Sequence, residues 1–186
     1  MTVVIATTIK RYLGLSGDAK PTAPPAGSTF YETDTGAMYV YDGAAWGFLW
    51  EAGPFRASKT VAFTGAANLG AVGNVPLFTV TGEVLIVAIV PFCTETLVGA
   101  TATLALGVTG STALFIAATT GTLITVNLFW VDTAPDANGV ALPVALKDIV
   151  ITDNIVGTVA VVGVTDGTIR FDVLWRPLST NGLVAA

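Results

Sequence analysis

The chain has 186 residues, of which 53% are hydrophobic and only 11% are charged, and its formal net charge is −5. This length supports one sizeable hydrophobic core and a small additional unit, and the acidic balance disfavours a nucleic-acid partner because few cations are present to neutralise phosphates. Histidine is absent, which excludes Ser-His-Asp and Cys-His catalysis and most transition-metal sites.

Residues 1–23 are predicted to form an N-terminal arm and linker. β-Branched side chains are frequent in residues 1–15, which favours an extended arm over a helix, although Ile5, Ile9, Tyr12 and Leu13 lie near helical spacing. The arm is either a strand of the protein's own fold or a strand added to a neighbouring subunit. A secretory signal is not expected, because the cations at positions 10 and 11 follow the apolar run instead of preceding it. No stretch is long and apolar enough to predict a membrane span.

Residues 24–55 are predicted to form a small β-hairpin unit. The turn residues at 34–36 and 42–43 separate predicted strands at 29–33 and 38–41, and residues 47–51 extend the unit. An isolated hairpin is only marginally stable in water, so the aromatic side chains of this unit are expected to pack against another surface. These aromatic residues are Phe30, Tyr31, Tyr39, Tyr41 and Trp46.

Residues 56–178 are predicted to form the main body, an antiparallel β-sandwich in an all-β protein. Turn signals recur at roughly 8–12-residue spacing with no helical pattern between them, and residues 169–175 alternate as a half-buried strand should. Cys93 is expected to be a small buried side chain, and residues 179–186 are expected to form a loosely ordered tail. The predicted strands of the body are residues 57–63, 75–80, 83–93, 101–108, 113–118, 122–131, 155–164 and 169–175, with 144–151 as a strand or a short helical turn.

No catalytic constellation is predicted. Glu32 and Asp34 could share a strand face, but glycosidase carboxylates come from separate elements, so turn and capping roles are expected instead. Asp132, Asp136 and Asn138 fall in one loop and could offer oxygens to calcium, yet their spacing fits no defined calcium motif, and a solvated loop is preferred. The sequence therefore predicts a protein that is not an enzyme and has no metal and no cofactor.

Residues 20–46 carry a motif that points to a family. Lys20-Pro21-Thr22 is followed by PxGSxFYETDTGxxYxYDGxxW over residues 25–46. This motif resembles a recurrent module of tailed-bacteriophage virion proteins, found near the N-terminus of head-associated and tail-associated proteins. The remainder of the chain, ending in residues 175–178, more loosely resembles the β-sandwich body of phage capsid decoration proteins. By analogy with these proteins, a jelly-roll-like sandwich is expected.

The resemblance implies a capsid decoration, or cement, protein that binds the outside of the head and stabilises the shell. Its partners would be the major capsid protein and other copies of itself, most plausibly as a trimer, with no nucleic acid and no membrane. It would lie on the virion surface after assembly in the host cytoplasm. The expected capsid-binding or subunit-binding residues are Ile5, Ile9, Tyr12, Phe30, Tyr31, Tyr39, Tyr41 and Trp46.

Two other functions stay open at this point. A tail, fibre or baseplate component could use the same module for attachment, although a fibre usually adds a long shaft for which this chain has no room. A small carbohydrate-binding protein or carbohydrate-active enzyme is the third possibility, and the sparse acids and missing histidines argue against the enzyme. The low content of charged residues fits a protein that hides apolar surface in an assembly.

Overall fold

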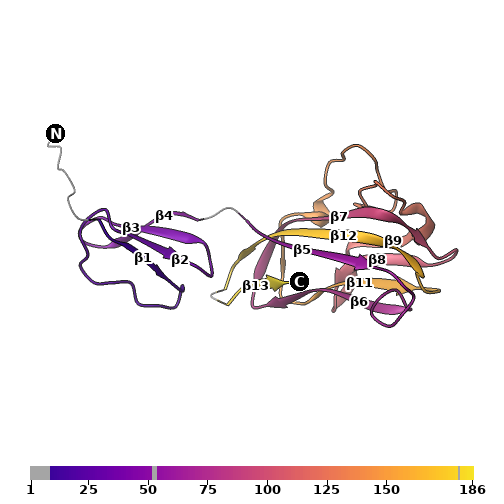
Figure 1. Ribbon diagram of the computed structural model, residues 1–186, viewed down its shortest axis with the longest axis horizontal. Helices are drawn as coiled ribbons and strands as arrows, with labels where there is room; N and C mark the ends of the chain where they lie inside the picture. The colour runs from indigo at the N-terminus through magenta and orange to yellow at the C-terminus, as the bar shows by residue number, and fades with distance from the viewer. Residues whose placement is uncertain (1–8, 52–53, 180) are drawn as a thin grey trace. The chain divides into compact units, whose positions relative to one another are not determined.

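The protein divides into two compact units, residues 1–53 and 54–186, which are coloured in sequence order in Figure 1. A computed structural model describes residues 9–51, 54–179 and 181–186, and for residues 48–51 the backbone alone. The regular elements of the described residues are β-strands and two short 3-10 helices, which confirms the predicted all-β class. The strands of the first unit are β1 (Arg11–Gly14), β2 (Thr29–Glu32), β3 (Ala37–Tyr41) and β4 (Trp46–Glu51).

The second unit contains the remaining elements. They are β5 (Phe55–Ala62), β6 (Gly73–Thr81), β7 (Val84–Val98), β8 (Thr103–Val108), β9 (Ser111–Thr120), η1 (Gly121–Leu123), η2 (Val144–Leu146), β10 (Ile149–Ile151), β11 (Ile155–Ala160), β12 (Asp166–Pro177) and β13 (Leu183–Ala185).

The first unit is a four-stranded sheet in the order β1-β2-β3-β4. β1 runs parallel to β2, while β2–β3 and β3–β4 are antiparallel pairs. Because side chains alternate along a strand, β2 directs Phe30 and Glu32 to a covered face and Tyr31 to the other face. We call this unit the small sheet.

The described part of the predicted arm belongs to the small sheet and is not a separate segment. Residues 11–14 form β1, so the extended conformation favoured over a helix is confirmed there, and these residues are a strand of the protein's own fold. The N–H group of Thr29 donates to the carbonyl of Lys10 at 3.0 Å, which continues this pairing one residue before β1. Ile5 and the rest of residues 1–8 lie outside the described residues.

The second unit is an antiparallel β-sandwich, as the sequence predicts (Figure 1). One sheet has the order β10-β7-β12-β5 and the other has the order β13-β6-β11-β8-β9. Buried side chains from both sheets form one hydrophobic cluster. From β5 to β12, each connection passes from one sheet to the other except the β8–β9 hairpin. This alternation is compatible with a jelly-roll-like sandwich, which stays a prediction.

β12 shows most clearly how the sequence builds the core. Ile169, Phe171, Val173 and Trp175 are buried at every second position, which confirms the predicted alternation. Cys93, on the neighbouring strand β7, is fully buried and free, as expected. Burial raises the pKa of its thiol, so the reactive thiolate is disfavoured and the residue acts as a small packing group.

One expectation for the body is wrong. Residues 122–131 do not form a strand: η1 opens the segment, and Asn127 has a φ of 67°, outside the extended region. The apolar side chains that suggested a strand, Ile124 and Trp130 among them, are buried in the core instead. Residues 144–151 contain both alternatives in succession, η2 and then β10.

The C-terminal tail is not loosely ordered where the structure describes it. β13 pairs antiparallel with β6, and Val184 between its two ends is only 4% exposed. The edge of β6 therefore gains backbone partners, and the end of the chain gains a buried anchor. This pairing spans about a hundred positions of sequence, so no local pattern could predict it.

Gly70 in the β5–β6 loop gives a test of the core geometry. A Cβ atom at this position would collide with the backbone oxygen of Val164, whereas Gly73 faces open space, and both residues have positive φ values of 114° and 126°. Since the positive φ strains alanine at either site, the difference between the two substitutions measures the collision alone. We expect Gly70→Ala to lower the free energy of unfolding by about 1–3 kcal/mol more than Gly73→Ala, as measured by urea denaturation. Equal losses would contradict the close approach of Gly70 to the backbone of Val164.

Candidate binding site on the small sheet

Trp46 is the centre of the covered face of the small sheet. Its ring lies edge-on to Tyr12 and Phe30 at centroid distances of 6.2 and 6.1 Å, and tilted to Tyr41 at 5.4 Å. Its indole N–H group donates to the carbonyl of Pro21 at 2.9 Å. The segment between β1 and β2 is therefore fastened over the aromatic rings, and this face is closed by the chain itself.

An ion pair also holds the segment between β1 and β2 in place. Lys20 Nζ lies 2.7 Å from Glu32 Oε1, and Glu32 is only 3% exposed. The hydroxyl of Thr35 donates to the other carboxylate oxygen at 2.6 Å. Lys20 Nζ also lies 4.1 Å from the ring centroid of Tyr39 and 5.0 Å from that of Phe30. The ammonium group is thus held by a carboxylate and two aromatic faces, which gives Glu32 a structural role.

Two exposed aspartates of the small sheet, Asp34 and Asp42, fix turns. Burial by itself would raise the pKa of Asp34, but the hydroxyl and N–H groups of Ser16, at 2.6 and 2.8 Å, hold that pKa below its ordinary value. The N–H groups of Ala45 and Ala44 likewise lower the pKa of Asp42. The predicted turn and capping role is confirmed for Asp34, and Glu32 instead binds Lys20, so the two do not form an acid–base pair.

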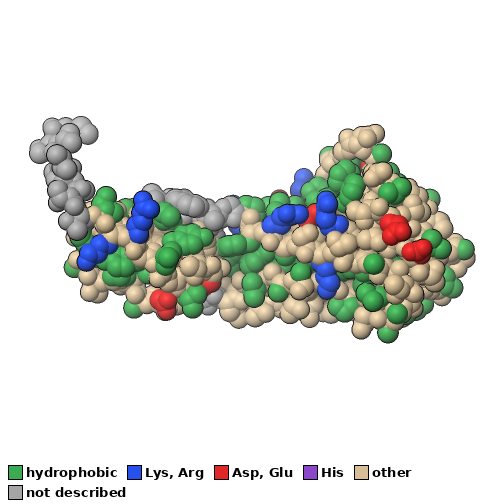
Figure 2. Space-filling view, in the orientation of Figure 1, with side chains coloured by type: hydrophobic (Ala, Val, Ile, Leu, Met, Phe, Trp, Pro, Cys, Tyr) green, Lys and Arg blue, Asp and Glu red, His purple; other side chains and the backbone are tan. Residues whose placement is uncertain are grey.

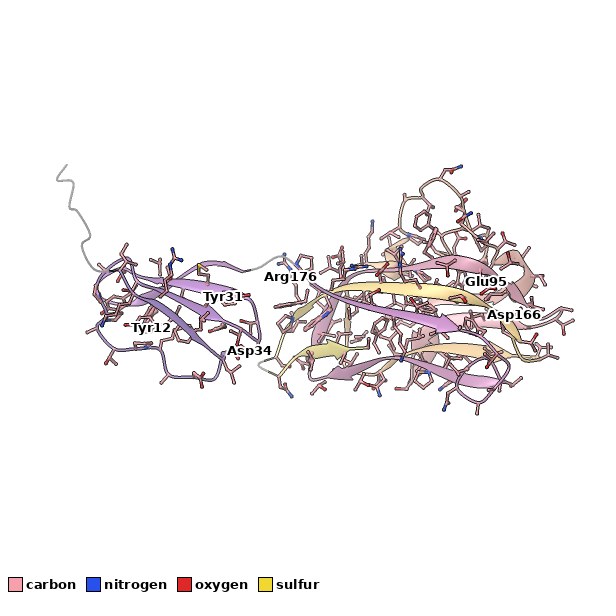
Figure 3. All side chains as sticks on the ribbon, in the orientation of Figure 1. Tyr12, Tyr31, Asp34, Glu95, Asp166 and Arg176 are labelled. Carbon is pink, nitrogen blue, oxygen red and sulfur yellow. The ribbon has the colours of Figure 1, made fainter. Side chains whose placement is uncertain are left out.

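The opposite face of the small sheet is open and carries a row of apolar side chains beside Arg11 and Thr29. Leu13, Tyr31 and Met38 occupy paired positions on three successive strands, and Val40 follows two residues after Met38 on the same face. Leu13 is 75% exposed, and the other three are partly exposed. Tyr31 is labelled on this sheet in Figure 3. We call Leu13, Tyr31, Met38 and Val40 the open face.

The edge of β1 continues this apolar surface. Ile9 and Leu15, on either side of β1, are 55% and 53% exposed, and β1 is the outermost strand of the sheet. Uncovered apolar side chains in a group are typical of a protein-binding surface. The open face and this edge are the best candidate for a binding site in the first unit.

The structure divides the predicted binding residues into two groups. Phe30 and Tyr41 are buried inside the small sheet, so the expectation that they contact a partner directly is corrected: they hold the unit together. Tyr12, Tyr39 and Trp46 are half-buried on the same covered face. Of the predicted set, Ile9 and Tyr31 remain available to a partner, and Ile5 lies outside the described residues.

Sequence reasoning missed Leu13, Met38 and Val40, which are aliphatic or thioether side chains among conspicuous aromatics. The sequence contains a signal for Leu13, because alternation along a short strand places Arg11 and Leu13 on the face opposite to Tyr12. Recognising it requires the parallel register of β1 against β2, which brings Leu13 opposite Tyr31. The alternation of Phe30 with Tyr31 then assigns each residue to its face.

The acidic loop of the body is held by its own hydrogen bonds. Asp132 accepts a bond from the N–H group of Ala134 at 2.6 Å, and the backbones of Phe129 and Asp136 bond to each other. Within the described ranges, no group of three or more acidic or cysteine side chains is placed to hold a metal ion. Nor does any described helix have the length and apolar character needed to cross a membrane.

Charged side chains on the body are few and separated. On the face shown in Figure 2, hydrophobic and other uncharged atoms cover most of the body. Figure 3 shows Glu95 and Asp166 near one end of β12 and Arg176 near its other end. Between them, Asp172 accepts charged hydrogen bonds from Arg56 at 2.6 Å and Arg170 at 2.8 Å.

This ionic group predicts how the body responds to acid. Burial alone would raise the pKa of Asp172, but hydrogen bonds from Ser58, Arg56 and Arg170 hold that pKa below its ordinary value of 3.8. The stabilisation is therefore fully present above this value and is lost as the pH falls through the lower pKa of the folded protein. When stability is measured as a function of pH, Asp172→Asn should make the free energy of unfolding fall less steeply below pH 3.8 than it does in wild type. A wild-type slope in Asp172→Asn would contradict this role.

No protein-family model matches this chain, and no curated protein matches it. The functional interpretation therefore rests on the residues themselves and on the motif at residues 20–46.

Proposed function

We propose that this protein is a capsid decoration protein of a tailed bacteriophage. It is a structural component and not an enzyme, it binds the outside of the head as a homo-oligomer, with a trimer favoured, and it stabilises the shell. The observation that carries the proposal is the open face, an apolar surface on a small unit distinct from the body. The resemblance of residues 20–46 to a virion module supports the same function.

In this proposal, the small sheet anchors the protein to the major capsid protein. Leu13, Tyr31 and neighbouring side chains lose contact with water on binding, which contributes about 25 cal/mol for each Å² of apolar surface buried. The covered face contributes indirectly, because Trp46 and the Lys20–Glu32 pair hold the strands that present the open face. The body then occupies the capsid surface and makes contacts between copies.

A place in the tail, fibre or baseplate is the alternative, because the same module occurs in tail-associated proteins. It uses the same open face and differs in the number of copies per particle. A carbohydrate-binding role gains no specific support: Phe30 is buried, and the indole N–H group of Trp46 is bonded to the carbonyl of Pro21.

The anchor is tested by binding full-length protein to capsids of the encoding phage that lack it. Leu13→Glu places a charge on the open face at a position that is already 75% exposed, so the fold should be retained while binding weakens by roughly tenfold or more. Ala19→Glu, an exposed change in the segment over the covered face, is the matched control and should bind like wild type. Co-sedimentation measures both. Undiminished binding of a folded Leu13→Glu protein would refute the anchor.

A further inference from the structure

The outermost strands of the sandwich differ in how they are protected from other chains. The four outermost strands are β5, β9, β10 and β13. β5 carries Arg56 and Lys59, and β10 and β13 have three residues each. Charges and shortness are the usual devices that keep a sheet edge from pairing with another molecule. β9 has ten residues, with no charge and no proline among them.

β9 presents small apolar side chains outward at two points. Its register against β8 shifts twice, between Leu104 and Leu106 and between Leu106 and Val108. The exposed residues of β9 fall largely at these irregular places, as the pairs 113–114 and 117–118. β-Bulges of this kind re-aim side chains while the rest of the strand keeps its place in the sheet. Here they direct Leu114 and three alanines to the surface.

A shallow apolar hollow lies between β9 and β10, the edge strands of the two sheets. It has a volume of about 220 Å³, and its lining includes Leu114 from β9 with Val150 and Ile151 from β10. Val150 is itself 58% exposed. Val144 begins η2, which contacts β9, and it is 81% exposed, the most of any large hydrophobic residue that the structure describes. One side of the sandwich therefore carries both a hollow and a projecting aliphatic side chain.

We propose that this side of the sandwich, defined by Leu114, Val144 and Val150 and called the β9 seam, binds a second copy of this chain. The projecting side chain of one copy can enter the hollow of the next copy, a head-to-tail contact that can close into a ring. β9 brings no charge to the contact, and the charged residue in the lining of the hollow is Asp153. At the rim, the exposed Lys147 of one copy can approach the exposed Asp148 or Asp153 of the other.

The β9 seam deepens the homo-oligomer part of the proposed function, and it is testable without a virion. If the protein associates through the β9 seam in solution but is absent from virions, the proposed function alone is contradicted. If the protein is present in virions but is a monomer in solution at micromolar concentration, the contact between copies at the β9 seam alone is contradicted.

The experiment measures the molar mass of the full chain by size-exclusion chromatography with light scattering over the micromolar range. Wild type should show a multiple of the 19.0 kDa chain mass. The double variant Leu114→Glu/Val144→Glu should weaken association by roughly tenfold or more, because two carboxylates then enter an apolar contact. Val72→Glu, at an exposed valine of the β5–β6 loop outside the seam, is the matched control and should keep the wild-type mass.

Hydrogen–deuterium exchange of residues 54–186 establishes that each variant is folded. If the double variant does not fold, Val144→Ser decides, since it removes the projecting side chain without adding charge, and it should also weaken association. A monomeric wild type, or a folded variant at the seam that associates as tightly as wild type, would overturn the proposal.

Discussion

Trp130→Ala should lower the free energy of unfolding of the body by about 3–5 kcal/mol, the largest loss expected for any side chain considered. Trp130 is fully buried in the cluster between the two sheets, although it belongs to no strand. Its backbone N–H group donates to Pro91 on β7 at 3.1 Å, and its indole N–H group donates to the hydroxyl of Thr119 on β9 at 3.0 Å. Removing the ring leaves a large cavity and frees the segment that links the two sheets.

Trp130→Phe separates the ring from its hydrogen bond. It keeps most of the buried apolar volume and loses the donor to Thr119, whose hydroxyl still donates to Ala117, so a loss of about 1 kcal/mol is expected. Urea denaturation at fixed protein concentration measures both variants, and hydrogen exchange assigns the loss to residues 54–186. A Trp130→Ala protein within about 1 kcal/mol of wild type would show that residues 124–131 are not part of the core.

Lys20→Met should destabilise the small sheet by roughly 2–3 kcal/mol. The substitution keeps the aliphatic length but leaves the carboxylate of Glu32, which is 3% exposed, with the hydroxyl of Thr35 as its remaining side-chain partner. The loss is placed below the roughly 3–5 kcal/mol of a fully buried pair because the Lys20 side chain is 20% exposed and keeps some contact with water. The cation–π contacts to Tyr39 and Phe30 are lost as well.

Lys10→Met is the matched control for this prediction. Lys10 is exposed in the same unit and its ammonium group makes no ion pair that the structure describes, so a change within about 0.5 kcal/mol is expected. Hydrogen–deuterium exchange followed by mass spectrometry compares residues 9–47 with residues 54–186 in each variant. The Lys20→Met effect should appear in the first range alone. Unchanged exchange there would mean that the ion pair does not hold the covering segment.

Local sequence patterns predicted most strands of the body correctly. Residues 169–175 alternate regularly, and they lie within β12. The segment 122–131 has a similar apolar content, but its side chains enter the core from an irregular backbone. Apolar content alone does not distinguish these cases, because burial requires only that the side chain point inward. The pairing of β13 with β6 depends on a distant strand and leaves no local signal.

The candidate binding site shares Ile9 and Tyr31 with the predicted set, whereas Leu13, Met38 and Val40 were not in that set. The aromatic residues of the small sheet stood out, and their clustering around Trp46 explains why: they form the internal packing of a unit too small to have a larger core. Which face remains open depends on β1 lying parallel to β2 and on Lys20 and Pro21 crossing the covered face. These are non-local features, so Leu13 became recognisable as a surface residue only with the register known.

The proposed function assigns separate tasks to separate surfaces of one chain. In this proposal, the open face of the small sheet binds the capsid, and the β9 seam of the body binds other copies. Variants of the two surfaces should therefore have separable effects: Leu13→Glu changes capsid binding and leaves the molar mass in solution unchanged, whereas the variants of the seam change the molar mass.

The most direct test of a capsid decoration function is the copy number of this protein in purified virions of the encoding phage. Quantitative mass spectrometry with isotope-labelled peptides gives this number relative to the major capsid protein. Decoration of the head predicts a ratio near one, or a simple fraction set by the capsid lattice. A few copies per particle would place the protein in the tail or at a single vertex, and its absence from the virion would contradict a structural role in the particle.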